Sequence, residues 1–199
     1  MRSSGRALRT AEGVGLMRLF LGLRLPDMHR RALAELQSNV PAGRAVPWDN
    51  FHMTLVFLGD ATTALVDELD LALDGMRLVL PEINLGGLGQ FGGGNPRAVW
   101  VAVAPLGPLD ALHRRLGNVA RGVGFEVPSR RFVPHVTLTR FARETVPPTA
   151  VAKFFQQRGS FALPAFQPHA VTLFRSHLRG DGPDYETLAD YPITPGQIT

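Results

Sequence analysis

A four-residue pattern, His-x-Thr-Leu, occurs twice in this chain and constrains its fold more than any other feature. The first copy is residues 52–55 and the second is residues 135–138, 83 positions later. A His-Arg-Arg triplet precedes each copy, at residues 29–31 and 113–115, with a spacing of 84 positions. Two features in one order at nearly one offset indicate two copies of a strand–helix–strand unit. We therefore predict a duplicated, bilobal chain whose paired strands face one central cleft.

Hydrophobic periodicity predicts alternating strands and helices around that repeat. Dense or alternating apolar stretches predict strands at residues 16–25, 51–58, 98–103, 132–140, 170–174 and 185–191. Helical spacing predicts a helix opened by Pro26 and ended by Pro41, followed by helices at residues 65–80, 108–119 and 147–157. The glycine-rich run at residues 86–94 is expected to be a flexible loop at the cleft rim. Residues 1–16 are expected to be a flexible extension ahead of a single domain at residues 17–199.

Composition excludes several classes of protein. Apolar residues make up 45% and charged residues 19% of the 199 positions, which is typical of a globular chain. No uninterrupted apolar run approaches the roughly 18 residues of a membrane span, so no membrane partner is expected. Cysteine is absent, which excludes a disulfide scaffold, a thiol nucleophile and cysteine-ligated zinc. A cytoplasmic monomer without an obligate protein partner is expected, and the net charge of +4 is compatible with an anionic ligand.

The paired tetrads carry the chemistry that the sequence predicts. Alternation along a strand places His52 with Thr54 on one face, and it places His135 with Thr137 on one face of the second strand. Two imidazoles in one cleft suit acid–base catalysis, because an unperturbed imidazole titrates at about 6.5 and one ring can be neutral while the other is charged. Such a site fits in-line displacement at phosphorus without a metal. Zinc is the weaker alternative, since no carboxylate follows or precedes His135 closely on its own strand face.

Five sequence blocks in a fixed order carry a resemblance to a known family. They are MRLF at residues 17–20, FHMTLVFLGD at 51–60, PHVTLTR at 134–140, LFRS at 173–176 and YE at 185–186. The chain resembles the 2H phosphoesterase superfamily, and within it the bacterial and archaeal RNA 2′,3′-cyclic phosphodiesterases, formerly called 2′-5′ RNA ligases. The resemblance extends over residues 17–193. It implies an α+β fold with two antiparallel sheets, flanked by helices, around a central cleft. It also implies metal-independent opening of an RNA or nucleotide 2′,3′-cyclic phosphate to a 2′-phosphomonoester, with no cofactor.

By motif position, the resemblance implies a role for five side chains. His52 matches the proton donor to the departing 3′ oxygen, and His135 matches the proton acceptor that activates water. Thr54 and Thr137 match hydroxyls that contact the phosphate, and Arg140 matches a cation that holds it. Simple alternation puts Arg140 on the apolar face of its strand, so this side chain reaches the cleft only if the strand ends or bulges there.

Two other functions stay open on the sequence alone. The same histidines would serve joining or cleavage of 2′-5′ linkages in tRNA or oligonucleotides, and a non-catalytic RNA- or nucleotide-binding module would share the fold. Trp48, Phe91 and Phe132 are candidates for stacking on a base. Phe57 is expected in the core, and the helical histidines of the two His-Arg-Arg triplets are expected to face solvent.

Overall fold

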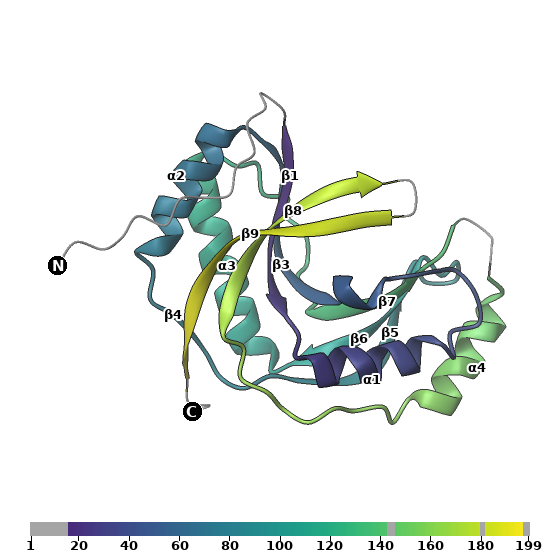
Figure 1. Ribbon diagram of the computed structural model, residues 1–199. Coiled ribbons are helices and arrows are strands. Elements are labelled where there is room, and N and C mark those ends of the chain that lie inside the picture. Colours follow the sequence, from purple (N-terminus) through teal and green to yellow (C-terminus); the bar gives the residue numbers. More distant parts are fainter. Residues whose placement is uncertain (1–15, 143–145, 180–181, 197–199) are drawn as a thin grey trace.

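The computed structural model describes residues 16–142, 146–179 and 182–196, and Figure 1 shows their arrangement. The strands are β1 (Met17–Arg24), β2 (Arg44–Ala45), β3 (His52–Ala61), β4 (Leu78–Leu80), β5 (Asn84–Phe91), β6 (Ala98–Ala104), β7 (His135–Arg140), β8 (Ala170–Arg179) and β9 (Gly182–Pro195). The helices are α1 (Asp27–Gln37), the 3₁₀ turn η1 (Trp48–Asn50), α2 (Thr63–Asp74), α3 (Leu106–Val123) and α4 (Pro148–Arg158). The predicted α+β class is confirmed. The predicted extension lies outside the described residues apart from Leu16.

One mixed sheet connects the described strands. Its order is β4-β9-β8-β1-β3-β7-β6-β5, and β2 pairs with the end of β7. Among the described strands, β4 and β9 pair parallel, and the other pairs are antiparallel. The structure therefore differs from the predicted pair of separate antiparallel sheets. Its two halves are joined in the middle, where Met53 of β3 pairs with Val136 of β7.

Equivalent strands lie on the two sides of this β3–β7 pair, β1 beside β3 and β6 beside β7. β1, α1 and β3 form one strand–helix–strand unit, and β6, α3 and β7 form a second unit in the same order. The two strands of each unit pair antiparallel with each other. Each helix also contacts the central strand of the other unit, since α1 packs against β7 and α3 packs against β3. The duplication itself stays a prediction, but the arrangement sets both tetrads at the centre of the sheet.

The core lies between the sheet and its helices. β1 buries Leu19, Leu21 and Leu23, each at most 1% exposed, and a fully buried leucine contributes about 1.5–3 kcal/mol. α1 begins at Asp27, whose carboxylate is favourable at a helix N-terminus. α3 ends at Val123 and is capped by Gly124, whose φ of +116° disfavours other residues. Figure 1 shows α2 and α3 on one side of β1 and β3, with α1 and α4 beneath the other half of the sheet. Within the described residues, no helix has the length and apolar character needed to cross a membrane.

A β-bulge interrupts β3 at Leu55. The residues on either side of Leu55 pair with two adjacent residues of β1, so Leu55 is an extra residue in the ladder. The extra residue reverses the alternation, because Leu55 and Val56 are both buried whereas Phe57 is 62% exposed. The prediction that Phe57 lies in the core is therefore wrong. Its ring centroid is 6.4 Å from that of Phe20, on the polar face of the tetrad.

The equivalent bulge interrupts β7 at Leu138, 83 residues later. Adjacent residues of β6 pair with Thr137 and Thr139, which leaves Leu138 as the extra residue. Leu138 and Thr139 are both buried, and Arg140 is exposed. The bulge therefore turns Arg140 to the face of His135 and Thr137, which simple alternation does not do.

Two predicted elements differ in the structure. Most of the glycine-rich run is not a loop, because residues 84–91 form β5 and pair with β6. The Trp100 ring packs against β5 at Gly89, where a Cβ would clash with the ring, so only glycine allows this close approach. The helix predicted at residues 65–80 ends earlier, since α2 stops at Asp74 and residues 78–80 pair with β9.

Candidate active site

The two tetrad histidines are oriented by the same kind of hydrogen bond. Each is the first residue of its strand, and each donates a hydrogen bond from Nδ1 to the backbone carbonyl two residues before it. His52 donates to Asn50 over 2.7 Å, and His135 donates to Val133 over 2.6 Å. An imidazole whose Nδ1–H is used in this way presents Nε2 as its reactive nitrogen. The site therefore has two rings with the same tautomer, and in each of them Nε2 is the nitrogen that the backbone does not use.

The sheet register places the tetrads side by side. Met53 and Val136 pair directly, and both are completely buried. Their neighbours on each strand point to the opposite face, so His52, Thr54 and the polar residues of the second tetrad line one surface. Because the pair is antiparallel, Thr137 lies on the side of His52, and Thr54 lies on the side of the other histidine. Within the first tetrad, the Thr54 hydroxyl is 3.0 Å from His52 Nε2 and donates to it when the ring is neutral.

Arg140 adds a cation to this surface. Its charge acts on His52 and His135 and lowers the pKa of both, and it opposes the rise in the pKa of Tyr185 that burial causes. These three rings come from three different strands. Arg140 therefore shares the face of His135 and Thr137, to which the bulge at Leu138 turns it.

The surroundings of both histidines favour their neutral forms. Burial lowers the pKa of His52 to about 4, although its hydrogen bond to the Asn50 carbonyl opposes the shift, and the charges of Arg140 and His135 add to it. Burial also lowers the pKa of His135, against its bond to the Val133 carbonyl, with a further contribution from Arg140. Both rings are therefore neutral near pH 7 in the free protein. This differs from the expected pair of one neutral and one charged ring.

Aromatic side chains form a wall around His52. The ring centroid of Phe20 lies 4.8 Å from that of His52, Tyr185 meets His52 edge to face at 5.0 Å, and Phe174 follows at 5.8 Å. Sequence analysis missed all three as site residues. Each lies in a block that carries the family resemblance, which was an available signal. The residue pattern of a single strand does not show, however, which strands follow next to it, and here β1, β8 and β9 follow β3 in the sheet.

The three predicted base-stacking candidates have different surroundings. Phe91 meets His135 edge to face at 4.9 Å and is 37% exposed, so it borders the site. Phe132 stacks on His113 with centroids 4.3 Å apart, which occupies one face of its ring. Trp48 lies under the guanidinium of Arg30, 4.6 Å from the ring centroid. Phe91 is therefore the candidate that the structure places next to the histidine pair.

The helical histidines do not face solvent, so that prediction is wrong. His29 is 2% exposed, and its Nε2 lies 2.8 Å from the carbonyl oxygen of Pro164. His113 is half-buried, and its Nδ1 donates to the carbonyl of Leu55 over 2.7 Å. Both helices pack on the sheet through the face that carries the histidine, which a hydrophilic triplet in the sequence does not reveal.

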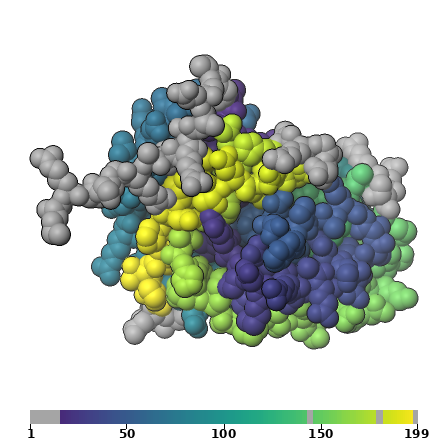
Figure 2. Space-filling view, viewed as in Figure 1, coloured from purple at the N-terminus to yellow at the C-terminus, as the bar shows by residue number. Residues whose placement is uncertain are grey.

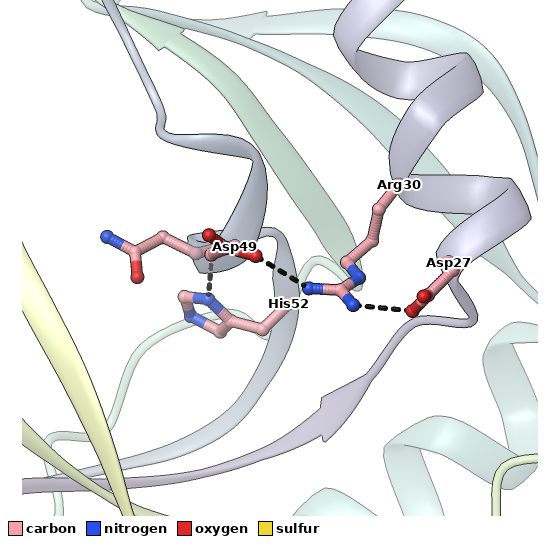
Figure 3. Close-up of polar contacts among 5 residues, drawn as sticks. Asp27, Arg30, Asp49 and His52 are labelled. Carbon is pink, nitrogen blue, oxygen red and sulfur yellow. Dashed lines mark hydrogen bonds and ion pairs between the residues drawn. The ribbon is translucent and has the colours of Figure 1, made fainter.

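An ion-pair network fixes the turn that orients His52. Arg30 of α1 lies between Asp27 and Asp49, at 2.5 Å and 3.3 Å, as Figure 3 shows. Asp49 belongs to η1, the turn that also supplies the Asn50 carbonyl to His52. The Asn50 side chain donates to Pro183 of β9 over 2.6 Å. In Figure 2 the yellow residues of the β8–β9 hairpin accordingly lie against blue residues that follow α1. The turn is thus held from both sides.

The described residues contain no group of three or more His, Cys, Asp or Glu side chains that could hold a metal ion. The chemistry that they do present consists of two imidazoles, two hydroxyls and a guanidinium on one face of the sheet. These groups can exchange protons and donate hydrogen bonds to an anion.

Comparisons with known proteins agree with this site. A family model described as the 2′-5′ RNA ligase superfamily matches residues 25–180. The RNA 2′,3′-cyclic phosphodiesterase of Thermus thermophilus is 34% identical over 89% of this chain and 90% of its own length. Those of Escherichia coli and Aeropyrum pernix are 32% and 31% identical, each over 73% of this chain, with 88% and 83% of their own lengths covered.

Solved structures show the same likeness in three dimensions. Escherichia coli LigT complexed with 3′-AMP aligns with a TM-score of 0.73 and 26% identity, over 90% of this chain and 99% of LigT. TT0787 of Thermus thermophilus aligns with a TM-score of 0.72 and 29% identity, over 91% of this chain and all of TT0787. With a family model matching most of its length, this chain belongs to the 2′-5′ RNA ligase superfamily.

Proposed function

We propose that this protein hydrolyses RNA 2′,3′-cyclic phosphate ends to 2′-phosphomonoesters by metal-independent acid–base catalysis. His52 is the proton donor and His135 is the proton acceptor. The observation that carries the proposal is the common orientation of the two rings, each fixed through Nδ1 by a backbone carbonyl. The names of relatives that are about 30% identical support the same substrate class.

The proposed reaction balances with these groups alone. His135 Nε2 takes a proton from water as the water oxygen forms a bond to phosphorus. The bond between phosphorus and the 3′ oxygen breaks, and His52 Nε2–H gives its proton to that oxygen. The products are a 2′-phosphate and a 3′-hydroxyl. His52 ends neutral and His135 ends protonated, so proton exchange with solvent restores the starting state.

Substrate binding favours the protonated form of His52, which is scarce in the free protein near pH 7. A bound phosphodiester anion opposes the effects of burial and Arg140, so it raises the pKa of His52 toward protonation. Protonation also reverses the hydrogen bond inside the first tetrad, because Nε2–H then donates to the Thr54 oxygen. The Thr54 hydroxyl proton becomes free to donate to a phosphate oxygen. Thr137 and Arg140 are proposed to bind the same phosphate group.

The proposed setting is a monomer in the cytoplasm acting on RNA or nucleotide ends, with the aromatic wall beside the nucleoside. A second activity uses the same site. If a 5′-hydroxyl replaces water as the nucleophile, the same 3′ oxygen leaves and a 2′-5′ linkage forms. The description of the family model as a 2′-5′ RNA ligase superfamily favours testing this alternative.

A short RNA ending in a 2′,3′-cyclic phosphate, incubated with the protein in excess EDTA, tests the proposal. We expect an unchanged rate relative to a sample without EDTA, and a 2′-phosphate as the product in phosphorus NMR. Loss of the activity in EDTA with recovery on added zinc would overturn metal independence. A 3′-phosphate would reverse the leaving group assigned to His52. Joining to an added 5′-hydroxyl RNA in place of hydrolysis would favour the ligase reaction.

We expect the pH profile of kcat/KM to be shifted to lower pH than the profile of two imidazoles with ordinary pKa values. This parameter reports the free enzyme, where the pKa of His52 is lowered to about 4 and that of His135 is also lowered. Protonated His52 becomes scarce as the pH rises through its pKa, and neutral His135 becomes scarce as the pH falls through its own. Both limbs, which belong to the coupled pair, should therefore lie below about 6.5.

Initial rates on a cyclic nucleotide well below KM, measured between about pH 4 and pH 8, give this profile. The limbs of kcat should lie at higher pH than those of kcat/KM, because the bound anion favours the imidazolium form. Limbs of kcat/KM at or above pH 7 would contradict the expected effect of burial.

A further inference from the structure

At each of the two β-bulges, the backbone carbonyl of the extra residue accepts hydrogen bonds from groups outside the β1–β3 and β6–β7 pairs. These carbonyls belong to Leu55 and Leu138, the last residues of the two tetrads. Both residues are almost completely buried. A buried carbonyl without a hydrogen bond is costly, so donors to these two carbonyls stabilise the bulges.

Side chains from the opposite unit donate to these carbonyls. Gln37, the last residue of α1, donates from Nε2 to the carbonyl of Leu138 over 2.5 Å and to the carbonyl of Val46 over 2.9 Å. The backbone N–H of Val46 also donates to Leu138, over 2.9 Å. At the other bulge, His113 of α3 donates to Leu55 over 2.7 Å. Each helix thereby holds the bulge in the strand of the other unit.

The bulge at Leu138 decides where Arg140 points. Without the extra residue, strict alternation would return Arg140 to the face of Val136 and Leu138, both of which are fully buried. An unpaired guanidinium on that face would be strongly unfavourable. With the bulge, Arg140 lies on the same face as His52 and His135, where its charge lowers the pKa of both rings.

We propose that Gln37 is a positioning residue for Arg140, because its side-chain amide holds the bulge that turns Arg140 onto the face of the two tetrad histidines. The effect of Gln37 on reaction rate rests on the proposed function. Its effect on the charge around the two histidines does not, so the inference can be tested in a protein of any activity. Gln37 lies 101 residues from Leu138 in sequence, and no tetrad pattern marks it.

The test combines Gln37→Met, which removes the amide at similar length, with Arg140→Ala. NMR titration of the His52 and His135 ring protons is the first readout. Arg140→Ala should raise both pKa values, because a positive charge leaves their surroundings. Gln37→Met should shift them in the same direction, and it should add no shift when Arg140 is already alanine. Gln37→Leu serves as a second amide-free variant, and circular dichroism checks that each variant is folded.

Rates on a cyclic phosphate form the second readout. We expect Gln37→Met to lower kcat/KM about fivefold to tenfold, and by less than twofold in the Arg140→Ala background. His113→Phe is the matched control, since it keeps a ring against Phe132 but removes the donor to the bulge at Leu55. Its loss of rate should be the same whether or not Arg140 is present, because that bulge turns Phe57 and not Arg140.

Two results would overturn the inference. One is that the pKa values of His52 and His135 are unchanged in both folded Gln37 variants, although Arg140→Ala shifts them. The other is an equal loss of rate from Gln37→Met with and without Arg140, which indicates only a general structural role. A protein that is inactive on RNA but shows the expected titration shifts would refute the proposed function and leave the positioning role of Gln37 in place.

Discussion

Replacing His52 or His135 with alanine is expected to lower kcat by about 10²–10⁴-fold, the usual contribution of a positioned general acid or base. Each substitution removes one of the two Nε2 atoms on the polar face of the sheet, and the backbone carbonyl that oriented the ring loses its hydrogen bond. Since both protons move in one displacement at phosphorus, the double variant should be little worse than either single variant. Steady-state rates on a cyclic phosphate measure these losses.

His169→Ala is the matched control for both substitutions. His169 is exposed, and the stretch that it begins resembles a tetrad with one extra residue between His and Thr. Its replacement should leave kcat within a factor of about two, because surface substitutions usually change little. Activity close to that of the unchanged protein in either His52→Ala or His135→Ala would refute the acid–base assignment.

A separate test shows which of the two histidines is the general acid and which is the general base. A phosphodiester with a nitrophenolate leaving group needs no proton from a general acid, so it should restore much of the rate of His52→Ala. The same substrate should not restore His135→Ala, because water still needs a base. Restoration of His135→Ala alone would exchange the two roles.

The pairing of the tetrads could be predicted from the sequence because it depends on local rules. Alternation places His52 and Thr54 on the face opposite Met53, and the repeat places the second tetrad in an equivalent strand. The structure adds that Met53 pairs with Val136, which brings the two polar faces together. Roles for these side chains stay predictions until they are tested.

The remaining features depend on contacts between distant segments. Alternation placed Phe57 in the core, but the extra residue at Leu55 exposes it, and nothing in the local sequence marks a bulge there. His113 was expected in solvent, yet it donates to that same bulge from a helix 58 residues away. A hydrophilic triplet does not show which of its members the sheet will cover. Such errors follow from reading each element without its neighbours.

The equivalent bulges also explain how a repeated pattern forms an asymmetric site. Phe57 and Arg140 follow their tetrads at the same distance, 83 residues apart, and each is turned onto the polar face. At these two equivalent positions, β3 thus carries an aromatic ring and β7 carries a guanidinium. A nucleotide has the same two parts, a flat base and a charged phosphate. The difference between Phe57 and Arg140 therefore makes two equivalent strand positions chemically distinct.

Replacing Arg140 with alanine is expected to lower kcat/KM by about 10²–10³-fold, because a preorganised donor to the reacting phosphate contributes on this scale. Arg140→Lys should recover only part of the loss, since an ammonium is a point charge and does not bind two phosphate oxygens in parallel. The pH profile should change as well. Arg140 lowers the pKa of His52 and His135, so its removal should move both limbs of kcat/KM to higher pH.

Arg114→Ala provides a control with the same change in net charge. Arg114 is exposed on α3, where it pairs with Asp110 at 3.1 Å, and α3 packs on the core side of β3. It should change kcat/KM by less than about twofold, because an exposed pair of this kind contributes little. If both arginine variants lose the same small factor, Arg140 contributes only to the general positive potential. If Arg140→Ala alone loses activity but the pH limbs stay in place, Arg140 binds the phosphate without acting on the free histidines.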